Sequence, residues 1–157
     1  AVRNRDLPMI KYLLTLKEIN LDVRDKHKYR FSAIHHATQI KRIDVIKLLV
    51  ENGADFDYGS GGKNAGNTPL MIAAWSGFLQ AADYFLSHDS CTNQQDNNGY
   101  TPLMKACIKH DFKMVEKLID RTDLMIRCRD NKTAIDYLDA NNPKSSAIFE
   151  LFKGKLK

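Results

Sequence analysis

The sequence predicts an all-α fold in which short helix–turn–helix units stack along one axis. The first observation is a recurring motif, because the tetrapeptide Thr-Pro-Leu-Met at residues 68–71 returns 33 residues later at 101–104. The second is that related openings at Ser32 and Thr133 give successive intervals of 36, 33 and 32 residues. A period of this length is typical of a repeat array, in which each unit buries its apolar face only against its neighbours.

The unit that begins at Thr68 shows why these residues favour helices. Threonine is a good N-cap, and Pro69 suits the first helical position because its missing N–H would be unpaired there in any case. Small apolar residues follow on one side, and Gly77 stands where a glycine commonly ends a helix. A second apolar run at 78–86 has helical spacing. The unit is therefore predicted to be a pair of helices.

The Thr-Pro-Leu opening and the period near 33 residues resemble the ankyrin repeat. The resemblance implies an ankyrin-repeat solenoid whose helix pairs are joined by hairpin fingers, with residues 1–157 as one domain. Within it we expect a partial repeat at 1–24, full repeats at 25–57, 63–95 and 96–127, and a C-terminal capping repeat at 128–157. Because residue 1 falls in the middle of a unit, we expect repeats to continue upstream in a longer protein.

The remaining helices follow from the same signals. We expect helices over 7–16, 33–39, 44–52 and 112–120. In the last unit, Thr133 is expected to cap a first helix, and a final helix is expected from Ser145 or Ser146 to about Lys153, closed by Gly154.

Two segments depart from the family pattern. Arg30 stands where the family usually has glycine, which predicts a finger turn of different shape. Gly59-Ser60-Gly61-Gly62 lengthens the next finger and predicts a flexible loop. A phosphate-binding loop would need Ser or Thr after the lysine, but Lys63 is followed by Asn64, so a phosphate site is disfavoured.

Composition and residue spacing argue against catalysis, and we predict no enzyme activity, cofactor or metal. His35 and His36 are adjacent and would point about 100° apart on a helix, so they cannot share a metal ion. By resemblance, His35 bonds backbone and hydroxyl groups within the repeat. The three cysteines lack C-x-x-C spacing, which favours reduced thiols and an intracellular protein, in cytoplasm or nucleus. No apolar run approaches the length of a membrane helix, so we predict no membrane insertion.

The resemblance implies a concave surface, formed by the fingers and the ends of the first helices, that binds a partner. The predicted partner-binding residues are Tyr29, Phe31, Gln39, Ile40, Asn67, Trp75, Ser76, Tyr100, Ile108 and Lys109. Several are large and apolar where a merely soluble repeat would prefer polar residues, and Trp and Tyr are common anchors of interfaces. Packing against neighbouring fingers is the alternative, and for Tyr29 and Ile40 both interpretations stay open.

Basic residues would surround this surface, namely Lys28, Arg30, Lys41, Arg42 and Lys109. We therefore expect a protein or peptide partner with apolar anchors and acidic flanks, bound by a non-catalytic interaction module of a larger intracellular protein. The alternative is the recruiting or regulatory arm of an enzyme, such as an acyltransferase or ubiquitin-ligase subunit, or of a channel. The net charge of +5 is modest and the arginines do not line up with aromatic residues, so nucleic acid is disfavoured.

Overall fold

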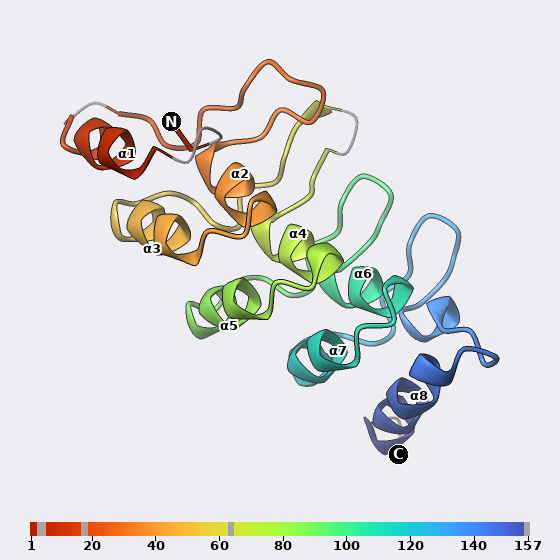
Figure 1. Cartoon of the computed structure of the whole chain (residues 1–157). Coiled ribbons are helices and arrows are strands. Elements are labelled where there is room, and N and C mark those ends of the chain that lie inside the picture. The colour runs from red at the N-terminus through yellow and green to blue at the C-terminus, as the bar shows by residue number, and fades with distance from the viewer. Residues whose placement is uncertain (3–5, 17–18, 63–64, 156–157) are drawn as a thin grey trace.

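The protein is an array of helix pairs stacked side by side along one axis (Figure 1). The computed structural model describes residues 1–2, 6–16, 19–62 and 65–155, and the regular elements in those ranges are all helices. The first helices of successive pairs form one row and the second helices form another, while the connecting fingers project to one side. The predicted all-α solenoid is confirmed.

Each pair consists of two short helices with a tight turn between them. The elements are α1 (Leu7–Leu14), α2 (Ala33–Gln39) with α3 (Ile43–Glu51), α4 (Pro69–Ser76) with α5 (Leu79–Ser87), and α6 (Pro102–Ile108) with α7 (Phe112–Leu118). A 3₁₀ turn, Ile119–Arg121, extends α7, a second 3₁₀ turn spans Ile135–Tyr137, and α8 (Pro143–Lys155) ends the described chain.

Local signals set the helix ends in the middle of the array. The Thr68 side-chain oxygen accepts from the Met71 amide, and the same bond recurs at the start of α6, each at 3.2 Å. Gly77 ends α4 with φ 65°, and the same place in the neighbouring units is taken by Lys41 at φ 56° and His110 at φ 50°. The turn geometry therefore repeats even where glycine is absent.

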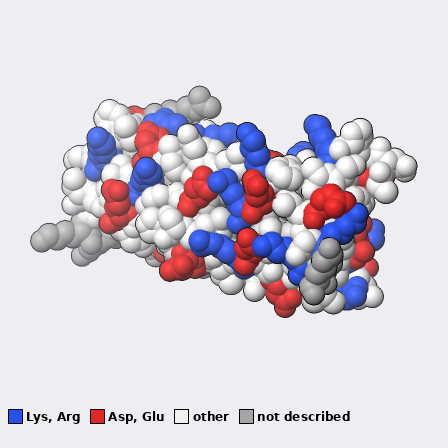
Figure 2. Space-filling view, turned by 90° about the horizontal axis from the view of Figure 1, so that it is seen from below, with Lys and Arg blue, Asp and Glu red and all other residues white. Residues whose placement is uncertain are grey.

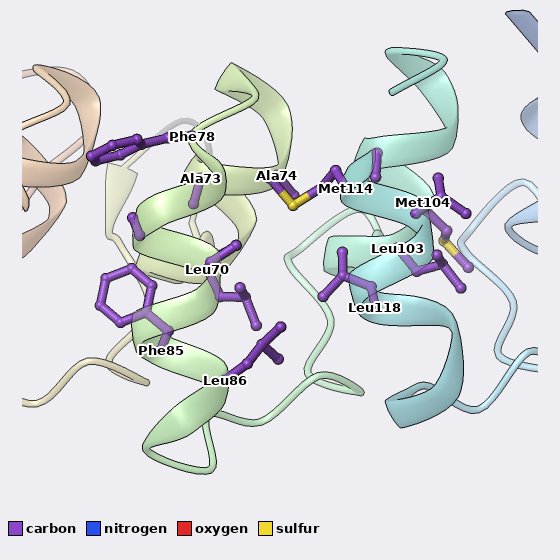
Figure 3. Packing of buried hydrophobic residues seen from close by; sticks show 14 of the residues in the cluster. Leu70, Ala73, Ala74, Phe78, Phe85, Leu86, Leu103, Met104, Met114 and Leu118 are labelled. Carbon is purple, nitrogen blue, oxygen red and sulfur yellow. The ribbon is translucent and has the colours of Figure 1, made fainter. Parts of the chain in front are cut away.

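The buried side chains form one continuous cluster along the axis. Figure 3 shows part of it, in the two central helix pairs. In the central pairs, Leu70, Ala74 and Phe85 are fully buried, as are Leu103 and Leu118 of the next pair. The alanines let the first helices approach closely, and the large side chains fill the space between successive pairs. Each unit is thus stabilised by its neighbours.

The last unit differs from the prediction. The prediction of a helix capped by Thr133 is wrong, because the chain there makes only a 3₁₀ turn. The Thr133 amide and hydroxyl both donate to Asp136 Oδ2, at 2.7 and 2.8 Å. The backbone is extended again at Leu138, with ψ 132°. The chain therefore leaves the helical conformation after this single turn.

The final helix is also longer than predicted. It begins at Pro143 rather than at Ser145 or Ser146, because Asn142 Oδ1 accepts from the Lys144 amide at 3.0 Å and proline fits the first turn. Ser145 is buried instead, with its oxygen 3.1 Å from His110 Nδ1. The helix runs through Gly154 to Lys155, so the glycine does not end it.

The two ends of the array have different surfaces. At the N-terminal end, α1 buries Ile10, whereas Met9 and Tyr12 are 46% and 62% exposed, and Leu16 is exposed beyond the helix. We refer to Met9, Tyr12 and Leu16 as the apolar end. The outer residues of α8 are mostly polar, with Lys144, Ser146, Glu150 and Lys153 exposed. The helix α1 is also shorter than predicted, ending at Leu14 rather than at residue 16.

The fingers are joined to one another by backbone hydrogen bonds. The Asn97 amide donates to the Ala65 carbonyl at 2.9 Å, and the Arg129 amide donates to the Asn98 carbonyl at 3.0 Å. Gly99, at φ 81°, closes its finger where a side chain would be 2.8 Å from the Cys128 backbone. The fingers therefore form a connected row beside the first helices.

The described part of the glycine-rich finger is hydrogen-bonded into the same row. The Gly61 amide donates to the Arg30 carbonyl at 3.3 Å, and the Ser60 amide donates to the Asn67 carbonyl at 2.8 Å. A side chain at Gly62 would lie 2.1 Å from the Lys28 carbonyl oxygen, so glycine is needed for this contact. The Lys63-Asn64 pair lies outside the described residues.

The finger turn at Arg30 keeps the glycine-like backbone, contrary to the predicted change of shape. Arg30 has φ 47°, and the same place in the other units holds Gly66 at φ 86°, Gly99 at φ 81° and Asn131 at φ 60°. A left-handed backbone is unfavourable for a residue with a large side chain. The fold therefore imposes this conformation on Arg30.

We predict that Arg30→Gly is more stable than Arg30→Ala by about 1 kcal/mol, because glycine adopts the left-handed backbone without a Cβ contact. Both variants lose the arginine side chain, so their difference isolates the backbone conformation. Urea denaturation followed by circular dichroism measures it. An alanine variant as stable as the glycine variant would show that the turn carries no strain.

Candidate interaction groove

A groove runs between the fingers and the first helices. Its volume is about 490 Å³, and it is lined by Tyr29, Phe31, Gln39, Asn67, Met71, Ile72, Trp75, Asp96, Asn98, Tyr100, Lys105 and Ile108. The lining brings together the predicted residues of three successive units, namely Tyr29, Phe31, Gln39, Asn67, Trp75, Tyr100 and Ile108. The predicted surface thus includes a continuous groove.

Trp75 is the most exposed aromatic residue that lines the groove. It lies in the last turn of α4 and half of its surface (50%) is accessible, although it belongs to an otherwise apolar helix. The Lys109 Nζ lies 4.9 Å from the centre of its ring, which is cation–π distance. Trp75 therefore offers accessible aromatic surface, although the rest of the fold covers half of the residue and Lys109 lies beside the ring.

The finger aromatics are more enclosed than Trp75. Phe31 is 8% exposed, and its ring stacks on Tyr29 at 5.5 Å and on His35 at 5.3 Å. Tyr100 is half-buried, with its ring 5.6 Å from that of Tyr137. Phe31 and the two tyrosines therefore serve the packing of the fingers while also lining the groove.

The structure places the other predicted residues beside the groove. Ser76 and Lys109 line a neighbouring cavity, and the Ser76 carbonyl accepts from Lys41 Nζ at 2.7 Å. Ile40 is half-buried at the end of α2 and lines neither the groove nor that cavity.

Sequence reasoning missed part of the groove floor, namely Met71, Ile72, Asp96 and Lys105. Lys105 is nearly buried, and its Nζ lies 2.7 Å from Asp96 Oδ2 and 5.3 Å from the Tyr100 ring. The sequence does contain a signal for this ion pair, because Lys105 stands inside an otherwise apolar helix shortly after an Asp-x-x-Gly turn. A charge at that place needs a partner.

The first full repeat has a similar pair in His36 and Asp25. The His36 Nε2 lies 2.6 Å from Asp25 Oδ2, and His36 follows Ser32 by four residues just as Lys105 follows Thr101. Burial alone would raise the pKa of Asp25, but the hydrogen bonds from His36 and from the His27 amide outweigh it and lower that pKa. In these two repeats a basic side chain thus ties a finger aspartate to the first helix.

His35 connects its repeat to the next finger. The Ser32 amide donates to Nδ1 at 3.3 Å, so Nε2 carries the proton and donates to the Asn67 carbonyl at 3.0 Å. Burial lowers the pKa of His35 to about 4, although the bond to the Asn67 carbonyl acts in the opposite direction. His35 is therefore neutral near pH 7, and its predicted structural role is confirmed.

Neither metal-binding groups nor membrane-spanning elements were found in the part of the chain that the structure describes. Across these ranges, no three His, Cys, Asp or Glu side chains converge to hold a metal ion. None of the helices there combines the length and apolar character that a bilayer span requires. On the face seen from below, acidic and basic side chains are interspersed (Figure 2).

The geometry agrees with a comparison of the sequence with family models. The model described as "Ankyrin repeats (3 copies)" matches residues 1–96 and 60–130, which is most of the chain. The chain belongs to the ankyrin-repeat family. Ankyrin repeats generally act as protein-interaction modules.

Similar ankyrin-repeat chains occur in proteins of different kinds. The chain is 26% identical to ankyrin repeat protein FPV031 of Fowlpox virus, over 84% of this chain and 38% of that protein. It is 26% identical to palmitoyltransferase AKR1 of Lachancea kluyveri, over 98% and 20% of the two lengths. It is 28% identical to protein phosphatase 1 regulatory subunit 27 of Mus musculus, over 78% and 75%. The chain spans well under half of the first two proteins.

Proposed function

We propose that this ankyrin-repeat chain is a non-catalytic module that binds a segment of a partner protein in the groove. The observation that carries the proposal is Trp75, a tryptophan that stays half exposed inside a groove shared by three units. Exposed aromatic residues in concave sites are the usual anchors of protein interfaces. The similarity to a phosphatase regulatory subunit supports a protein partner.

The partner that this surface fits best carries apolar anchors with acidic flanks. Trp75, Ile108 and the exposed edge of Tyr100 supply apolar contact area. Exposed Lys28, at the first finger, and Lys109, beside Trp75, supply positive charge at the two ends. As part of this proposal, the chain is one domain with the repeat boundaries predicted above. It works inside the cell, where the free thiols of Cys91, Cys107 and Cys128 stay reduced.

A second candidate is the recruiting arm of a larger enzyme. The supporting observation is the similarity to a palmitoyltransferase, of whose length the chain spans only 20%. In that case the groove would bind either a protein that the enzyme modifies or a protein that regulates the enzyme. The full-length sequence separates the two candidates directly, because a catalytic domain in it would favour the second.

We predict that Trp75→Ala weakens binding of groove peptides by about 2 kcal/mol, roughly thirtyfold, because a half-exposed tryptophan supplies much apolar contact area. The peptides are those selected from a random display library on the wild-type chain, and fluorescence anisotropy gives their affinities. The melting temperature is expected to change little, since half of the surface of Trp75 is already accessible to solvent and the residue lies outside the buried core.

The matched control is Tyr12→Ala, which removes an exposed aromatic residue at the apolar end. Its affinity for the same peptides is expected to equal that of the wild-type chain. Peptides that bind Trp75→Ala as tightly as wild type, or that lose equal affinity in both variants, would contradict the proposed groove.

A further inference from the structure

A second cavity adjoins the groove at Trp75. Its volume is about 700 Å³, and it lies between the end of α4, the turn from α6 to α7 and the start of α8. It is lined by Trp75, Ser76, Gly77, Lys109, His110, Asp111, Phe112, Lys113, Pro143, Lys144 and Ala147. Because Trp75 lines both spaces, a bound chain that covers the tryptophan can continue from the groove into the cavity.

Positive charge gathers in this cavity. Lys109, Lys113 and Lys144 are exposed, and within the described chain none of the three forms an ion pair. Among the described lining residues, the negative charge is that of Asp111, whose Oδ1 accepts from the Met114 amide at 3.1 Å and caps α7. The described lining therefore carries three lysines against one carboxylate, which leaves an excess of positive charge.

Some lysines of the array are paired with a carboxylate. Lys117 lies 2.6 Å from Asp83, Lys105 lies 2.7 Å from Asp96, and Lys153 lies 2.6 Å from Glu150. What distinguishes the three lysines of the cavity is that they line one space together, although they come from the end of α6, from α7 and from α8. We call Lys109, Lys113 and Lys144 the lysine cluster.

We propose that the lysine cluster binds an acidic stretch of the same partner segment whose apolar anchor covers Trp75. This inference rests on the proposed function and assigns a place to the acidic part of the partner. An extended chain advances about 3.3 Å per residue, so carboxylates within a few residues of the anchor reach the cluster. The pairing of opposite charges speeds association and selects partners more than it adds affinity.

The side chains favour several carboxylates over a single phosphate group. The described lining holds lysines and no arginine, and arginine is the residue whose planar fork matches a phosphate group with two parallel bonds. Lysine acts as a point charge, and three of them spread over a cavity match separate carboxylates. Nucleic acid is matched less well, because Trp75 and Phe112 do not form a series of stacking platforms.

A direct test needs no knowledge of the natural partner. A short acetylated oligoglutamate is titrated into the isotope-labelled chain, and amide chemical shifts are followed by NMR. Shift changes are expected at the amides of 109–113 and 144–147, and these changes are expected to disappear in high salt. Larger changes at the first finger around Lys28, or no changes at all, would overturn the inference.

A second test uses the peptides selected on the groove, each extended at one end by a run of glutamates or of glutamines. The glutamate peptides are expected to bind more tightly, and Lys113→Gln/Lys144→Gln is expected to reduce their affinity about fivefold to tenfold. The matched control, Lys11→Gln/Lys47→Gln, has the same change in net charge at exposed positions of α1 and α3 that line neither the groove nor the cavity, and it is expected to have little effect.

The outcomes separate this inference from the function on which it rests. Peptides that depend on Trp75 but show no preference for glutamate, or that respond equally to both lysine variants, overturn the acidic site and leave the groove intact. Loss of the Trp75 dependence overturns the groove itself. A phosphoserine extension that exceeds the glutamate run and depends on Lys113 and Lys144 would assign the cluster to phosphate instead.

Discussion

Replacing Phe85 with alanine is expected to destabilise the protein by about 4 kcal/mol, within the range of roughly 3–5 kcal/mol for buried phenylalanines. The ring is fully buried in α5, and its centre lies 6.2 Å from that of Phe56 and 6.2 Å from that of Tyr84. Its removal leaves a cavity in the core between successive helix pairs. Urea denaturation followed by circular dichroism measures the free energy of unfolding.

The control is Gln80→Ala, on the exposed side of the same helix, for which a change below about 0.5 kcal/mol is expected. Because the core is one continuous cluster, the Phe85→Ala protein is expected to unfold in a single transition at lower urea. Equal effects of the two variants, or two separated transitions, would show that the pairs do not share the core described above.

Acid is expected to destabilise the array through His35 by roughly 3 kcal/mol at pH 4. The pKa of this histidine falls from 6.5 to about 4 on folding, since burial disfavours its charged form. Unfolding between these values therefore takes up a proton. The stabilisation is complete above about pH 6.5 and is lost as the pH falls towards 4, and urea denaturation at a series of pH values measures this change.

The matched variant is His35→Gln, because glutamine at this helix position can make the same two bonds without titrating. Its free energy of unfolding is expected to depend less steeply on pH between 6.5 and 4. The carboxylate of Asp44, whose hydrogen bond from Arg42 lowers its pKa to about 2, acts below this window. The same slope in both proteins would show that His35 is not the group that takes up the proton.

The middle of the array could be predicted from sequence to within about one residue because its signals are local. Thr68 and Pro69 start a helix and Gly77 stops it, whatever the rest of the chain does. The last unit could not be predicted in this way. There, Thr133 and Asp136 make the same local bonds that Ser32 and His35 make at the start of α2, yet the chain forms only a 3₁₀ turn, so these local signals do not decide the outcome.

Part of the groove could be predicted because the repeat pattern fixes where some of its residues lie. The repeat period places Trp75 and Tyr100 at corresponding edges of their units, so the resemblance could select them. The burial of Phe31 depends on the packing of Tyr29 and His35 around it. The lysine cluster depends on how α8 sits against the turn from α6 to α7, which is tertiary information that the spacing of residues does not contain.

The two ends of the array differ in how well a further helix pair could pack against them. A further helix pair can bury apolar surface against Met9 and Tyr12 but gains little from the polar outer side of α8.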